Sequence, residues 1–110
     1  MGWIALLWAL GCAPSEEERA VANVRAELAT AQAEVLTSAS DCNTVAAAME
    51  QWHTEHQAEV AASNEAWEAI SQGTRDDLFE ANPAFHDAYS VRLRFTVQCI
   101  STPLRWFGER

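Results

Sequence analysis

The strongest constraint on this chain is a helix start followed by an apolar stripe at helical spacing. Ser15 and Glu18 form a capping box, in which each side chain accepts a hydrogen bond from the other residue's backbone amide. Apolar or small side chains then recur at alternating steps of three and four: Val21, Val24, Leu28, Ala31, Val35 and Ser38. Mostly Ala, Glu, Gln and Arg lie between them, and these residues favour helix. The pattern predicts a long helix with one narrow buried stripe.

The run from Thr37 to Asp41 predicts a turn and a new N-cap, because its Ser, Thr and Asp side chains compete for backbone hydrogen bonds. No Gly or Pro enforces a break there, so one continuous helix stays open as an alternative. A second helix is predicted from about Asp41 to Gln72, with Gly73 as its C-cap. Its expected buried stripe comprises Cys42, Val45, Met49, Trp52, His56, Glu59 or Val60, Ser63, Trp67 and Ile70.

Two further helix starts follow. Thr74 and Asp77 suggest a capping box for a short helix through Ala81, and Asn82 with Pro83 supplies an N-cap and a first-turn proline for a last helix. Residues 91–99 alternate apolar and polar side chains like a strand, but a lone strand would leave its backbone groups unpaired. We therefore expect a helix that Pro103 ends.

The buried face of this last helix is predicted as one broad arc. The arc collects Ala84, Phe85, Ala88, Tyr89, Leu93, Phe95, Val97, Cys99 and Ile100. Val91 falls outside it, whereas Arg92 lies within it and is expected to be half-buried or buried beside an acid of the second helix. The aromatic tail, residues 104–108, is expected to fold back over the end of the bundle. The alternative is a free tail that docks on a partner or on lipid head groups.

These elements predict an all-α fold for residues 16–110: a small antiparallel bundle of three long helices plus a short connecting helix. A chain of 110 residues forms one small domain at most. Its four glycines form no phosphate-binding loop, and no Gly-x-Ser-x-Gly or Cys-x-x-Cys-His motif occurs. We therefore expect neither an enzyme nor a cofactor.

The N-terminus has a different character. Residues 3–10 are an apolar run too short to cross a bilayer but of the right length for a secretory signal. The segment from Ala9 to Cys12 resembles the lipobox of bacterial lipoproteins. The resemblance implies a signal peptide at residues 1–11, a lipidated Cys12 and a short linker at residues 12–15. It also implies a place in the bacterial cell envelope facing the periplasm, and Ala13 after the cysteine favours the outer membrane. The alternative is an N-terminal apolar helix packed in the core.

With Cys12 used for lipid, Cys42 and Cys99 are left as one pair, as expected in an oxidising compartment. A disulfide between them would staple the bundle by closing a long loop. The alternative is two separate buried thiols that act as small apolar groups.

One possible metal site lies on the second helix, where Glu50, His53, His56 and Glu59 follow one another at steps of three. His53 and His56 lie on neighbouring turns and could hold one ion together. A ferritin-like site needs a second Glu-x-x-His motif, and the sequence has none. The metal site is therefore the weaker hypothesis, and a solvated acidic face is the stronger one.

Charge is unevenly distributed along a chain of net charge −9, which disfavours nucleic acid as a partner. Residues 13–80 hold 14 acids and 3 arginines (−11), and residues 81–110 hold 2 acids and 4 arginines (+2). We expect Arg92, Arg94 and Arg105 to lie against the acidic helices; alternatively, the acidic face binds a cationic protein. The sequence thus predicts a membrane-anchored helical protein with a structural or protein-interaction role. The alternative is a metal-binding sensor or carrier that uses His53 and His56.

Overall fold

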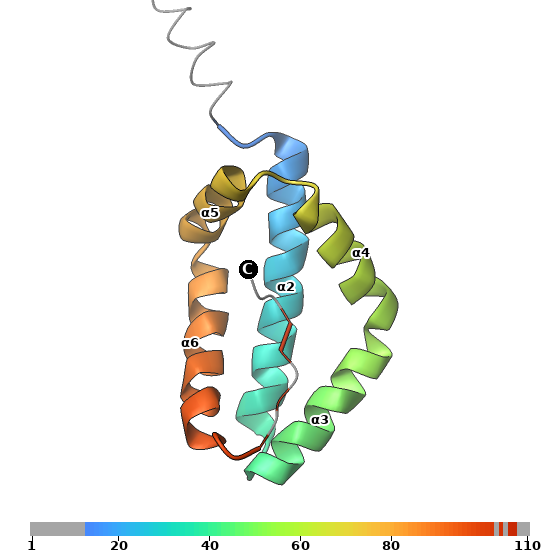
Figure 1. The fold of residues 1–110 in the computed structure, drawn as a ribbon, viewed down its shortest axis with the longest axis vertical. Coiled ribbons are helices and arrows are strands. Elements are labelled where there is room, and N and C mark those ends of the chain that lie inside the picture. Colours follow the sequence, from blue (N-terminus) through green and yellow to red (C-terminus); the bar gives the residue numbers. More distant parts are fainter. Residues whose placement is uncertain (1–12, 103, 105, 108–110) are drawn as a thin grey trace, which may run out of the picture.

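The computed structural model describes residues 13–102, 104, 106 and 107, and this part of the chain is helical, without strands. Its helices are α2 (Glu16–Ser38), α3 (Cys42–Glu55), α4 (Gln57–Glu68), α5 (Gln72–Ala81) and α6 (Pro83–Gln98). α2 packs against all the others: α6 lies on one side of it, α3 and α4 lie on the other, and α5 lies across one end (Figure 1). The all-α prediction is confirmed.

The expected helix starts are confirmed at three places. Ser15 caps α2 through the complete capping box with Glu18. Asp41 caps α3 by accepting a hydrogen bond from the amide of Thr44, so the chain does break between the first two helices. Asn82 caps α6, with Pro83 in its first turn. In each case a short polar side chain accepts an otherwise unpaired helix amide.

The prediction of the second helix is wrong in the middle of the helix and at its end. It is interrupted at His56, and α3 and α4 meet there at an angle and bow away from α2 (Figure 1). Ser71 caps α5, and the predicted cap Thr74 instead donates its amide to the Ser71 hydroxyl. Gly73, predicted as a C-cap, therefore lies in the first turn of α5.

The buried face of α2 is broader than the predicted stripe. Val24 is 52 % exposed, whereas the buried side chains are Ala22, Arg25, Ala26, Leu28, Gln32 and Leu36. The physical reason is that α2 is covered from two sides, so a wide face is buried in place of a narrow seam. Small alanines on this face leave room for large rings such as Trp67 and Phe85.

α6 also differs from its predicted arc. Val91, placed outside the arc, packs against the buried cluster of Leu36, Val45 and Met49. Leu93, Val97 and Ile100, placed inside it, are 47 %, 73 % and 84 % exposed. The broad apolar arc thus consists of two faces, and only one of them meets α2. The helix itself ends at Gln98, with Cys99 as C-cap, before the predicted stop at Pro103.

The aromatic tail folds back, as expected, but it reaches the middle of the bundle and not only its end. Phe107 is 5 % exposed and belongs to the buried cluster with Leu28 and Trp52. Leu104 and Trp106 pack partly buried on the neighbouring cluster that Leu36 anchors. The tail therefore fills the space that the bend between α3 and α4 leaves over α2.

Candidate functional site

The two histidines of the possible metal site each use a ring nitrogen in a hydrogen bond, with different partners. His53 is buried, and its Nε2 lies 3.2 Å from Nε2 of Gln32. An amide nitrogen only donates, so His53 Nε2 is the acceptor and its lone pair is already used. Nδ1 of His56 lies 2.9 Å from the carbonyl oxygen of Trp52 and donates to it. The His56 ring also stacks on Trp52, with centroids 4.6 Å apart.

The two acids of that site do not converge with the histidines. Each step of three residues falls about 60° short of a full turn, so four such positions spread around the helix and do not share one face. Glu50 and Glu59 are both exposed, and the bend at His56 lies between them. Within the described residues no group of three or more His, Cys, Asp or Glu side chains is placed to hold a metal ion. The geometry gives the metal hypothesis no support.

Gln32 links His53 to the C-terminal tail. While its amide nitrogen donates to His53, its Oε1 accepts a hydrogen bond of 3.1 Å from the backbone N–H of Phe107. Gln32 is itself buried, at 4 % exposure. Both ends of the amide are therefore satisfied inside the protein, which buried polar groups require. Nothing in the sequence pattern marked Gln32, because its partner lies 75 residues away.

Arg25 forms a second buried polar centre on the same face of α2. Its guanidinium donates to the Ser63 hydroxyl (3.2 Å) and to Oδ1 of Asn64 (3.0 Å). It also lies over the rings of Trp67 and Phe107, 5.3 and 4.7 Å from their centroids. Burial, reinforced by the positive charge of Arg75, lowers the pKa of Arg25 to about 10. The side chain is still charged at neutral pH, and it binds α4 and the tail to α2.

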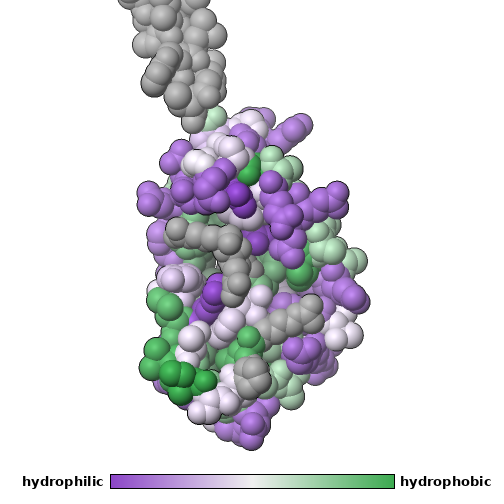
Figure 2. All heavy atoms as spheres, viewed as in Figure 1, coloured by the Kyte–Doolittle hydropathy of each residue, from purple (hydrophilic) through white to green (hydrophobic). Residues whose placement is uncertain are grey.

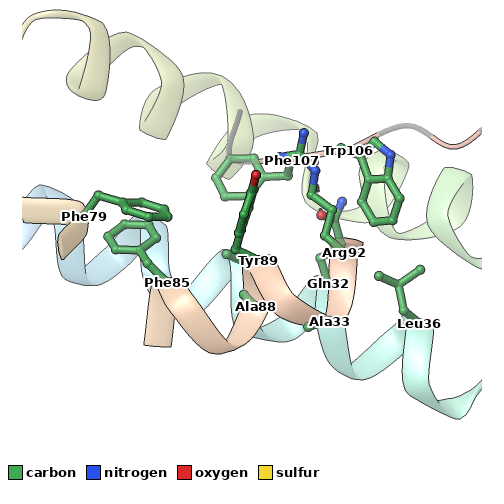
Figure 3. A pocket seen from close by; sticks show the side chains of 11 residues that line it. Gln32, Ala33, Leu36, Phe79, Phe85, Ala88, Tyr89, Arg92, Trp106 and Phe107 are labelled. Atoms are coloured by element: carbon green, nitrogen blue, oxygen red, sulfur yellow. Dashed lines mark hydrogen bonds between the residues drawn. The ribbon is translucent and has the colours of Figure 1, made fainter. Parts of the chain in front are cut away.

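A small cavity lies between α2 and α6 where the tail covers them (Figure 3). Its volume is about 30 Å³, enough for about one water molecule. Arg92 is half-buried beside it, as predicted, with its guanidinium 5.8 Å from the ring centroid of Tyr89 and 5.6 Å from that of Trp106. Pairing of Arg92 with an acid of the second helix stays a prediction. The cavity is lined by Ala29, Gln32, Ala33, Leu36, Phe79, Phe85, Ala88, Tyr89, Arg92, Trp106 and Phe107.

Cys42 and Cys99 form a disulfide, with their Cα atoms 5.5 Å apart. The bond joins the first residue of α3 to the C-cap of α6. The start of α3 and the end of α6 lie near the C-terminal end of α2 (Figure 1). Two separate thiols are therefore excluded for this structure. Cys12, predicted to carry lipid, lies outside the described residues, as does Arg105.

The described helices include none with the length and apolar character needed to cross a membrane. Comparisons with protein-family models, with curated proteins and with solved structures found no match to this chain.

Proposed function

We propose that this chain is a lipid-anchored protein of the bacterial cell envelope that acts by binding other molecules and not by catalysis. The observation that carries the proposal is the lipobox-like segment Ala9–Cys12, followed within a few residues by the capped start of α2 at Ser15. Lipid on Cys12 would hold the bundle close to a membrane surface, because the linker is too short to carry it far away.

Two structural features support the proposal. The Cys42–Cys99 disulfide suits an oxidising compartment such as the periplasm. The cavity beneath the tail is too small for a substrate, and the larger hollows, of about 260 to 500 Å³, are open at the surface, so a surface role fits the described residues better than a reaction in an enclosed cavity. By the lipoprotein resemblance, Ala13 directs the protein to the outer membrane, facing the periplasm.

Metabolic labelling with a fatty-acid analogue in a bacterium that expresses the full chain tests the anchor. We expect label on the wild-type protein and none on Cys12→Ser. The matched control is Cys42→Ser with Cys99→Ser, which removes the other two cysteines and leaves the label in place. Label that persists on Cys12→Ser, or wild-type protein that stays unlabelled, would overturn the proposal that lipid on Cys12 anchors the protein. Separation of inner from outer membranes then tests the location.

A further inference from the structure

α6 carries a second apolar face, which points away from the core. Its inner face, built around Phe85, Val91 and Phe95, packs in the bundle. On the outside, Leu93 and Val97 of α6 and Ile100, two residues beyond its end, follow one another at steps of four and three, and are 47 %, 73 % and 84 % exposed. We call these three residues the outer stripe. A helix that is apolar on opposite faces is normally covered on both.

The outer stripe gathers toward one end of the molecule. Strongly apolar surface lies over the last turns of α6 in Figure 2, at the end away from residue 13. Scattered exposed apolar side chains are ordinary on a protein surface, but a contiguous group is typical of a binding surface.

Two hydroxyl groups beside the outer stripe are turned inward to their own helix. The Ser90 hydroxyl donates to the carbonyl of His86 (3.0 Å), and the Thr96 hydroxyl donates to the carbonyl of Arg92 (2.8 Å). Because these hydroxyl hydrogens already have acceptors on the helix, covering the outer stripe with an apolar medium costs less free energy than burying two unpaired hydroxyl groups would.

Positive charge flanks the outer stripe. The exposed Arg94 lies along one side of it, and the half-buried Arg92, whose guanidinium lies over the rings of Tyr89 and Trp106, lies along the other. The region from residue 81 onward is net positive, although Asp87 lies on the same helix. The acids are concentrated instead in residues 13–80. An aliphatic ridge with arginine flanks is the arrangement by which amphipathic helices bind anionic lipid surfaces.

We propose that the outer stripe of α6 lies on the surface of an anionic phospholipid bilayer, with the exposed Arg94 at the head groups. A second copy of the chain fits less well. In a two-fold antiparallel pairing of two stripes the same flank of each helix meets itself, which brings the Arg94 flank of one copy against the Arg94 flank of the other. This bilayer contact is additional to the proposed lipid on Cys12 and does not depend on it.

Photochemical labelling tests the contact on the full chain as cells produce it. The protein is mixed with vesicles of phosphatidylethanolamine and phosphatidylglycerol that contain a phospholipid with a photoreactive acyl chain. Lipid adducts are then mapped by mass spectrometry after reduction and tryptic digestion. We expect adducts on the peptide of residues 95–105, and much less labelling in vesicles of phosphatidylcholine alone, because Arg94 loses its anionic partners.

The test variant is Val97→Glu with Ile100→Glu, which we expect to lower labelling of that peptide about tenfold, because charged side chains resist burial in the interface. Both positions are exposed, so the fold is retained, and circular dichroism checks this. The matched control, Ala58→Glu with Ala62→Glu, adds the same charge at exposed positions of α4 and should label as the wild type does.

Absence of adducts on residues 95–105 in the wild type, equal labelling of the stripe variant, or photocrosslinks that join two α6 peptides would each overturn the proposal. The last result would assign the stripe to a second copy. The same digest shows whether Cys12 carries lipid. The proposed lipid anchor and the proposed bilayer contact of the outer stripe are therefore tested separately.

Discussion

Gln32 holds the backbone of Phe107, 75 residues away, through a buried hydrogen bond of 3.1 Å. The same side chain donates to His53 of α3. The side-chain amide of Gln32 on α2 thus links the bent α3–α4 pair to the C-terminal tail by hydrogen bonds.

Replacing Gln32 by alanine leaves a buried backbone N–H and a buried imidazole nitrogen without their present partner. We expect the free energy of unfolding to fall by about 2–4 kcal/mol, the cost of two unsatisfied buried groups. Urea denaturation of the oxidised protein measures it. The control is Gln51→Ala, which removes only an exposed bond to Glu55 and should cost under about 0.5 kcal/mol. Equal effects of the two substitutions would contradict the buried bridge.

Phe107→Ala removes a ring that lies over the guanidinium of Arg25 and near Trp52. We expect a loss of about 3–5 kcal/mol, as for other buried aromatic side chains. Ile100→Ala, at an apolar position that is 84 % exposed, should change stability by less than about 0.5 kcal/mol. If Phe107→Ala unfolds at the same urea concentration as the wild type, the tail does not contribute to the core in solution.

Removing the disulfide with Cys42→Ala and Cys99→Ala opens a loop whose ends are 57 residues apart. The chain-entropy relation gives a loss of about 4 kcal/mol for a loop of this length. Unfolding by urea under non-reducing conditions, with and without the bond, measures the difference. Mass spectrometry of the wild type should show one link from Cys42 to Cys99; two free thiols would contradict it.

Asp41 makes the end of the bundle near the disulfide sensitive to acid. Its carboxylate accepts hydrogen bonds from the backbone and the hydroxyl of Thr44, which lower its pKa below 3.8. A depressed folded-state pKa contributes stability above the unfolded value, and that contribution is lost as pH falls through the folded-state pKa.

The variant Asp41→Asn keeps a capping oxygen and removes the titration. Between about pH 6 and about pH 2 it should therefore lose less stability than the wild type. Thermal unfolding midpoints of the two proteins across this range give the comparison, and NMR titration of the carboxyl checks the pKa directly. Parallel pH profiles would argue against a role for Asp41.

Titration with Zn²⁺ should give no binding at micromolar metal, because the lone pair of His53 Nε2 accepts from Gln32 and the two glutamates lie apart. Isothermal calorimetry is the measurement. Binding that disappears in His53→Ala with His56→Ala would restore the metal hypothesis.

The sequence by itself determined the helical class and most helix starts. Ser15, Asp41 and Asn82 are recognisable as caps because a cap acts within three residues of its own position. The pairing of Cys42 with Cys99 was predicted by counting cysteines and not by geometry.

Only the tertiary structure decided which apolar positions are buried. Val91 and Leu93 are both apolar residues of α6, and one faces the core while the other faces solvent, because the position of α2 fixes which face is covered. Arg25, Gln32 and His53 are buried because their partners come from distant helices and the tail. Such partners leave no periodic signal in the chain, since hydrogen bonds between distant segments exist only after the segments have packed.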